Sequence, residues 1–246
     1  MKKYVFALSL AFISITAGAQ ISNSVRVSDD IELIRLSANA YVHVSHSEIP
    51  GYGRVASNGL VFINKGKAFL FDTPANDALT ETLVMYIENK LKARITGFAP
   101  NHWHSDCMGG LAYLLKRQIK SYANILTIEQ AKIHGLPVPG QAFSDSLHLR
   151  LGNKDILLYY PGPAHSTDNI AVWIPSEKIL FAGCMVKSMD SVNLGNTADG
   201  DLQEYPETIK RLKARFPKAE IVIPGHGAFG GPELIDHTLE LTGNLK

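Results

Sequence analysis

The chain carries, at positions 101–110, the stretch Asn101-His102-Trp103-His104-Ser105-Asp106-Cys107-Met108-Gly109-Gly110. His102, His104 and Asp106 alternate, so on an extended segment the two imidazoles and the carboxylate would share one side. Imidazole and carboxylate groups are common zinc ligands, and a thiol suits zinc better than magnesium or calcium. Two histidines near a strand end can also be satisfied by hydrogen bonds alone. The glycine pair allows a sharp turn directly afterwards, and the stretch therefore predicts a metal site.

Three further ligand candidates stand alone, and each comes at a tight turn after a predicted strand. His165 lies in a loop that contains Pro161, Gly162 and Pro163, Cys184 follows Ala182-Gly183, and His226 lies in Pro224-Gly225-His226-Gly227. Any one of them would more often be an ordinary loop residue. Together with the first three they provide six ligands, enough for two zinc ions with three protein ligands each. The open position that remains on each ion is typical of catalytic rather than structural zinc.

Hydrophobic periodicity around these turns predicts strands that alternate with helices. The expected strands cover 41–45, 60–64, 68–72, 95–99, 155–160, 170–174, 179–183 and 220–223. The expected helices cover 77–92, a segment after Gly109-Gly110, a segment with a capping box at 127–130, 203–215, and a last segment from about 232. Strands followed by helices, twice over, indicate an α/β or α+β chain with two sheets packed face to face and helices outside.

The polar segment Ser47–Asn58 contains Pro50, Gly51 and Gly53. It predicts a long mobile hairpin loop with Tyr52 at its tip.

The first nineteen residues have the pattern of a secretory signal peptide. Lys2 and Lys3 precede the apolar run Tyr4–Ile15, and Ala17-Gly18-Ala19 is a cleavage site. We therefore expect residues 20–246 to form one exported domain, and Gln20 offers no thiol for a lipid anchor. Without the two lysines, 22 basic residues face 23 acidic ones, a net charge of −1. This balance argues against nucleic acid or an anionic membrane surface as a partner.

Two cysteines in an exported chain raise the possibility of a disulfide. Cys107 and Cys184 each lie inside a predicted metal-binding run, which argues against that pairing. Cys107 is interpreted as a free thiol beside the site, with a ligand or disulfide role as the alternatives.

These motifs resemble those of the class B metallo-β-lactamases of the first subclass. The runs Asn101–Gly110 and Ala182–Lys187 are especially similar to the Bacteroides branch of that family. The resemblance covers essentially the whole chain after the signal peptide and implies an αββα sandwich of two similar halves, with the site in the groove between the sheets. It implies two zinc ions, the first bound by His102, His104 and His165 and the second by Asp106, Cys184 and His226.

The expected activity is therefore opening of the β-lactam ring of penicillins, cephalosporins and carbapenems, which confers antibiotic resistance. A zinc-bound hydroxide is expected to attack the lactam carbonyl, with Asp106 orienting it. Asn196 is a candidate donor to the developing oxyanion. The resemblance implies that Lys187 binds the substrate carboxylate. Tyr52 is a candidate to pack over an apolar substituent of the bound substrate. Asp72 is a candidate for orienting the site.

Two other functions remain as alternatives. A thioester-cleaving enzyme of the glyoxalase II type would usually have histidine in place of Cys107 and aspartate in place of Cys184. A zinc-binding module without turnover would not need Lys187 and Asn196. We expect a periplasmic monomer without a membrane anchor.

Overall fold

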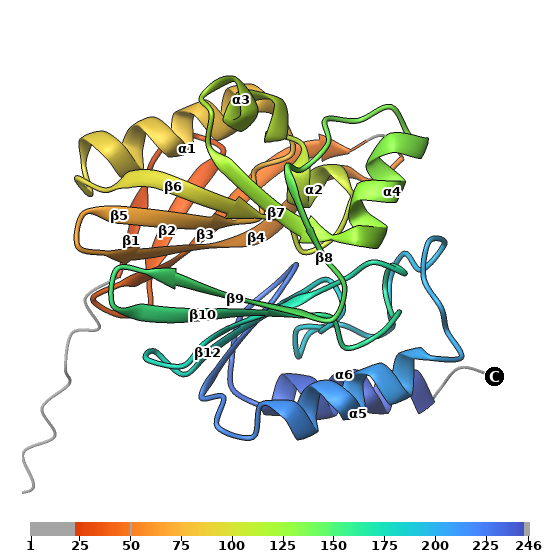
Figure 1. Cartoon of the computed structure of the whole chain (residues 1–246). Helices are drawn as coiled ribbons and strands as arrows, with labels where there is room; N and C mark the ends of the chain where they lie inside the picture. The colour runs from red at the N-terminus through yellow and green to blue at the C-terminus, as the bar shows by residue number, and fades with distance from the viewer. Residues whose placement is uncertain (1–22, 50, 244–246) are drawn as a thin grey trace, which may run out of the picture.

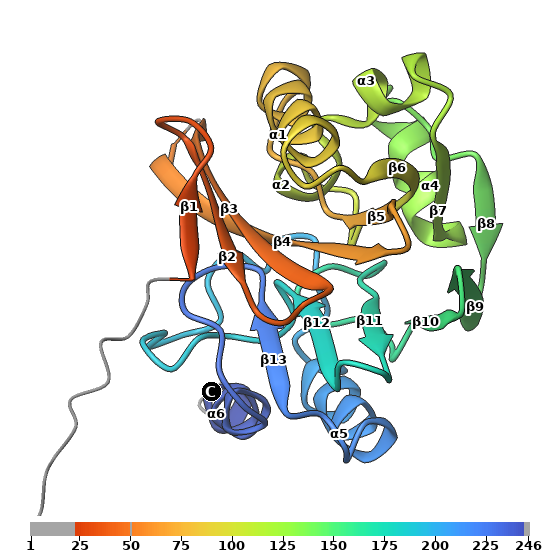
Figure 2. The ribbon, with the colours of Figure 1, turned by 90° about the vertical axis from the view of Figure 1, so that its left-hand side faces the viewer.

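The computed structural model describes residues 23–49 and 51–243. Two β-sheets pack face to face, and helices cover their outer faces (Figures 1 and 2). The predicted two-sheet sandwich is confirmed. The predicted signal peptide, residues 1–19, and Pro50 lie outside the described ranges.

The first sheet comes from the N-terminal half of the chain. Within the described ranges its eight strands follow sequence order, and only the contacts among β5, β6, β7 and β8 are parallel. The strands are β1 (Ser24–Arg26), β2 (Ile31–Arg35), β3 (Ala40–Ile49), β4 (Gly53–Asn64), β5 (Lys67–Phe71), β6 (Arg94–Ala99), β7 (Lys120–Asn124) and β8 (Gln141–Phe143). Its associated helices are α1 (Asp77–Asn89), α2 (Ser105–Met108), α3 (Leu111–Lys116) and α4 (Ile125–Ile133).

The second sheet comes from the C-terminal half and has the order β13-β12-β11-β10-β9. Its strands are β9 (Ser146–Leu151), β10 (Lys154–Tyr159), β11 (Ala171–Ile174), β12 (Ile179–Gly183) and β13 (Ile221–Pro224). Helices α5 (Tyr205–Arg215) and α6 (Glu233–Gly243) lie against its outer face (Figure 2).

The strands are apolar on both faces because each sheet packs against the other sheet on its inner face and against helices on its outer face. On β4, Leu60 and Phe62 belong to the cluster between the sheets, whereas Val61 belongs to the cluster under α1 and α3. Phe62, Phe71 and Phe181 meet in the central layer with no exposed surface. Full burial of such a side chain stabilises the fold by roughly 1.5–3 kcal/mol. This layer fixes the two sheets against each other and therefore fixes the loops at their edges.

The long loop predicted for Ser47–Asn58 is wrong. Strands β3 and β4 pair without a break from Ala40↔Phe62 to Ile49↔Gly53, and Tyr52 N donates to Ile49 O at 2.9 Å. A ladder of backbone hydrogen bonds satisfies this polar segment whatever its side chains are. The turn is short because Gly51 and Gly53 take positive φ values of 83° and 73°. Tyr52 does lie at the tip, with 63% of its surface exposed.

Two local predictions are also corrected. The capping box at 127–130 does not start a helix, because α4 begins at Ile125 and the Asn124 side chain accepts from Leu126 N. His102, His104 and Asp106 do not share an extended segment. His104 is the N-cap of α2, and Asp106 lies in its first turn. Within the described ranges, no helix combines the length and the apolar character needed to cross a membrane.

Candidate metal centre

The predicted ligands come from turns that follow strand ends at one edge of the sandwich. His102 follows β6, Cys184 follows β12, His226 follows β13, and His165 lies in the connection from β10 to β11. The structure brings the six residues together in two groups, each with its ligand atoms within 4.8 Å of one another. We refer to His102, His104 and His165 as the imidazole group, and to Asp106, Cys184 and His226 as the mixed group.

In the imidazole group, the ring nitrogens converge on one point. His102 Nε2 lies 2.8 Å from His104 Nδ1, and the ring centroids of His102 and His165 are 4.9 Å apart. His104 Nε2 lies 2.9 Å from Asp199 Oδ2. An Nε2–H that donates to this carboxylate leaves the lone pair of Nδ1 free to bind a metal.

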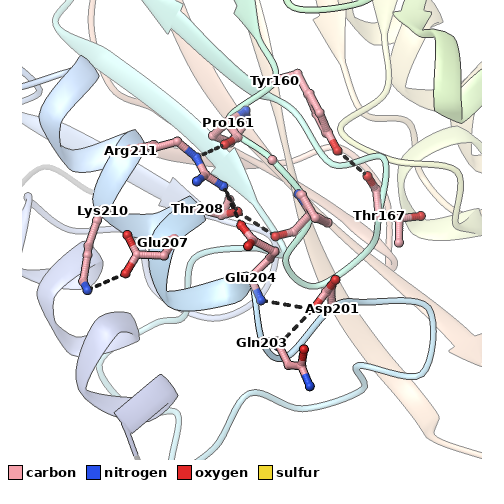
Figure 3. Close-up of polar contacts among 12 residues, drawn as sticks. Tyr160, Pro161, Thr167, Asp201, Gln203, Glu204, Glu207, Thr208, Lys210 and Arg211 are labelled. Atoms are coloured by element: carbon pink, nitrogen blue, oxygen red, sulfur yellow. Dashed lines mark hydrogen bonds and ion pairs between the residues drawn. The ribbon is translucent and has the colours of Figure 1, made fainter.

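The loop that carries His165 is held by α5 through its backbone (Figure 3). Arg211 Nε donates to Pro161 O at 2.6 Å, and Thr208 Oγ1 donates to Pro163 O at 2.7 Å. Across the same loop, Tyr160 OH donates to Thr167 O at 2.9 Å. Three polar contacts therefore fix a segment that has no regular secondary structure, and they fix the position of His165 with it.

In the mixed group, the donors come from both sheets. His226 Nε2 lies 3.1 Å from Asp106 Oδ2, and Cys184 Sγ lies 3.7 Å from the same oxygen. His226 Nδ1 lies 2.7 Å from Ala56 O on β4, which orients Nε2 toward Asp106. A Cβ at Gly225 would lie 2.2 Å from Cys184 Sγ, so only glycine fits beside the thiol.

Burial and neighbouring charges give four of these side chains the protonation states that a metal needs. The exception is His226, where burial lowers the pKa but the negative charges of Cys184 and Asp106 raise it well above its usual value. Burial lowers the pKa of His165 to about 3 and the pKa of His102 well below its usual value, so both imidazoles are neutral. Burial alone would raise the pKa of Asp106, but the hydrogen bond from His226 and the imidazoles of His102 and His104 lower it further than burial raises it. The pKa of Cys184 falls to about 6, mainly through its hydrogen bond with Cys107.

The donor chemistry fits zinc. Three imidazoles form one group, and an imidazole, a carboxylate and a thiol form the other, all of which are known zinc ligands. Each group supplies three protein atoms, so an ion in either would keep an open position. The residues that would hold two ions are therefore present and close enough to act together.

Cys107 lies between the two groups. Its Sγ is 3.2 Å from His102 Nδ1, and with His102 and Cys184 it forms a further set of possible ligands within 4.8 Å. Both cysteines are free thiols. Asp72 is buried behind them, where its Oδ1 accepts from Asn101 N, and burial raises its pKa well above the usual value. Asp72 therefore fixes the start of the 101–110 stretch through the backbone.

A cavity of about 470 Å³ opens beside the two groups. Tyr52 and Asn196 are part of its wall. Both are predicted to contact the substrate. The Asn196 Oδ1 accepts from Ala198 N at 3.1 Å, so its amide nitrogen is available to a ligand. Lys187 lies beside the mixed group, half-buried, and its Nζ donates to Cys184 O at 2.8 Å. Its predicted contact with a substrate carboxylate requires Nζ to exchange this partner, and that role stays a prediction.

Two features of the site were not predicted. Asp199 contacts His104 from a segment 95 positions away, and no local motif marks it. Trp103 stacks on His134 with ring centroids 4.2 Å apart, and together with Leu136 and Pro137 it forms an apolar wall of the cavity. The position of Trp103 between two predicted ligands was the available signal for this wall.

Comparison with known proteins gives a consistent result. Residues 52–226 match the Metallo-beta-lactamase superfamily. The chain is 48% identical to the metallo-beta-lactamase type 2 of Bacteroides fragilis over 239 residues, which is 97% of this chain and 95% of that protein. It is 37% identical to the metallo-beta-lactamase type 2 of Bacillus cereus, covering 86% of this chain and 82% of that protein.

Solved structures agree with the sequence relatives. The DIM-1 metallo-beta-lactamase exposed to ceftazidime superimposes with a TM-score of 0.84 at 36% identity, covering 88% of this chain and 98% of that one. The metallo-beta-lactamase from Pontibacter korlensis gives a TM-score of 0.83 at 36% identity, covering 87% of this chain and 99% of that one.

Proposed function

Because the chain belongs to the metallo-β-lactamase superfamily, we propose that it is a hydrolase that opens β-lactam rings with two zinc ions, one in each ligand group. The observation that carries this proposal is the pair of adjacent three-donor groups beside a cavity of about 470 Å³. Such an enzyme confers resistance to β-lactam antibiotics.

Zinc in sites of this kind lowers the pKa of a bound water to about 7 and polarises a carbonyl oxygen. The protein's own residues supply the remaining functions. The Asp106 carboxylate lies in the mixed group, 3.1 Å from His226 Nε2, where it accepts a hydrogen bond from the attacking water and orients it. The water oxygen bonds to the lactam carbonyl carbon, the carbon–nitrogen bond of the ring breaks, and the proton that the water loses is transferred to the ring nitrogen.

Substrate contacts come from the wall of the cavity. The Asn196 amide donates to the carbonyl oxygen, where negative charge develops during attack. The Lys187 ammonium attracts the carboxylate that β-lactams carry next to the ring. Tyr52 covers an apolar substituent from the tip of the β3–β4 hairpin.

We also propose that the protein acts as a monomer in the periplasm after removal of residues 1–19. The pattern of positive, apolar and small residues in that segment supports export. A membrane anchor is not part of the proposal.

The test is hydrolysis of a chromogenic cephalosporin by the purified protein, before and after removal of metal with a chelator. We expect turnover that falls to background on chelation and returns when zinc is added back. A thioester such as S-lactoylglutathione serves as the comparison substrate. Full turnover without metal, or cleavage of the thioester in preference to the β-lactam, would overturn the proposal.

A further inference from the structure

A second cavity, of about 610 Å³, lies at the opposite end of the first sheet from the metal centre. Its wall includes the first residues of three neighbouring strands, Lys67 of β5, Arg94 of β6 and Lys120 of β7. His102, by contrast, follows the other end of β6. This strand has six residues and therefore spans roughly 17 Å, so the cavity is separate from the metal centre.

The wall of this cavity is strongly cationic. Five basic residues and one acidic residue, Glu88, line it in a protein whose overall charge is close to zero. The five are Lys67, Arg94, Arg117, Lys120 and Arg150. A concentration of one charge in a concave surface attracts ligands of the opposite charge.

Internal ion pairs neutralise only part of this charge. Arg117 pairs with Glu88 at 2.9 Å, and Arg150 pairs with Asp155 at 3.1 Å on an exposed surface. Among residues 23–49 and 51–243, Lys67, Arg94 and Lys120 have no ion-pair partner. Lys67 and Arg94 are also register partners on adjacent strands, so two like charges stand side by side. This repulsion is unfavourable in the free protein, and a bound anion would relieve it.

The floor of the cavity is apolar and aromatic. The rings of Phe69 and Tyr122 stack with centroids 6.0 Å apart, and Leu149 and Leu151 of β9 face them from the second sheet. Arg150 lies between these two leucines, so its side chain points to the other face of β9, where it pairs with Asp155. Three unpaired cations at neighbouring strand starts, beside an apolar floor, suit an organic molecule with more than one anionic group better than a single small ion.

We propose that this cavity binds a small organic anion that carries two or more phosphate groups. Arg94 can offer a planar pair of donors to one phosphate, while Lys67 and Lys120 add positive charge. The apolar floor holds the carbon skeleton. The site is additional to the proposed hydrolysis of β-lactams and uses none of the same residues.

The phosphate groups can belong to a free metabolite or to lipid headgroups, and two assays on the zinc-loaded protein separate these sources. Calorimetric titration with fructose 1,6-bisphosphate tests the free form, and glucose 6-phosphate tests the need for a second phosphate. Cosedimentation with vesicles that contain cardiolipin, a lipid with two phosphate groups, compared with phosphatidylcholine vesicles, tests the lipid form. Each variant is checked for folding by circular dichroism and for unchanged β-lactam hydrolysis.

The test variants are Arg94→Glu and Lys120→Glu, both in the wall of the cavity. The control is Lys218→Glu, an exposed position between α5 and β13 at which the net charge changes by the same amount. We expect saturable bisphosphate binding that each cavity variant weakens about tenfold or more and Lys218→Glu changes less than about twofold. Glucose 6-phosphate should bind more weakly. Vesicle binding alone, with the same dependence on Arg94 and Lys120, would support the lipid source. Absence of both, or binding that these two variants do not weaken, overturns the proposal.

Discussion

The imidazole group and the mixed group lie next to each other and have the same number of donors, yet they differ in charge. The first offers three nitrogens, and burial lowers the pKa of His102 and His165, so these two remain neutral. The second offers one imidazole with a carboxylate and a thiol whose pKa values lie below their usual range. A zinc ion in the first group would keep its full charge, whereas an ion in the second would be largely neutralised. The difference suggests that polarisation of the substrate belongs mainly to the first group.

The groups also differ in what holds them. The imidazole group is held by contacts to loops. Asp199 accepts a hydrogen bond from His104, and Arg211 of α5 donates one to the segment that carries His165. The mixed group is held by the backbone of β4, where Ala56 O lies 2.7 Å from His226 Nδ1, and by the turn after β13, where Gly225 packs against Cys184. A change in the loops should therefore act on one group, and a change in this strand or turn on the other.

Loss of a mixed-group ligand should have the largest effect. We expect Cys184→Ala to reduce bound zinc from two ions to one and to lower kcat/KM by roughly a hundredfold or more. This loss should exceed that from removing a residue that only orients a ligand. Elemental analysis and steady-state kinetics measure the two quantities. Cys107→Ala is the control, and it should keep both ions and most of the activity. Equal losses in the two variants would mean that the thiols share one role.

The imidazole group can be weakened without touching a ligand. Asp199→Ala removes the acceptor that orients His104 and should reduce zinc affinity or activity by about 10- to 100-fold. A zinc titration of the stripped protein measures this effect. Asp190 is exposed and forms no hydrogen bond or ion pair with residues 23–49 and 51–243, so Asp190→Ala is the control with the same change in charge. If both variants behave alike, the contact between Asp199 and His104 does not support the metal.

Lys187 lies beside the mixed group but is not a ligand, so its removal should leave zinc content normal. A point charge attracts the substrate carboxylate in the ground state and the transition state about equally, which lowers KM without raising kcat. We expect Lys187→Ala to raise KM roughly ten- to hundredfold, with a smaller change in kcat and a defect that shrinks at high salt. A collapse of kcat at constant KM would place Lys187 in the chemical step instead.

Tyr52 touches neither group and should have the smallest effect. Its side chain is 63% exposed at the hairpin tip, so little surface is buried before a substrate arrives. We expect Tyr52→Ala to raise KM about two- to fivefold for β-lactams with a large apolar substituent. Substrates with a small substituent provide the comparison, because their KM should hardly change. Equal effects on both substrate types would argue against a covering role.

Much of the architecture could be predicted from local signals. Alternation and helical spacing identified β10–β13, α1 and α5, and a Gly- or Pro-containing turn after a strand marked each lone ligand candidate. The two-sheet sandwich followed from the repeated order of strands and helices. These features depend on neighbours in sequence, which the chain displays directly.

The remaining features depend on contacts between distant segments. The polar composition of segment 47–58 predicts a loop, but its two arms pair through backbone hydrogen bonds. The identity of the side chains does not reveal such pairing. Asp199 reaches His104 only after the second half of the chain has folded against the first. The cationic cavity likewise combines three strand starts with β9 of the other sheet, and no single stretch of sequence contains it.

The most direct test of the two-group centre is a crystal structure of the zinc-loaded protein with data collected on both sides of the zinc absorption edge. We predict two anomalous peaks, one among His102, His104 and His165 and one among Asp106, Cys184 and His226. A single peak shared by Cys107, Cys184 and His102, or no zinc in a protein that hydrolyses β-lactams at full rate, would contradict this prediction.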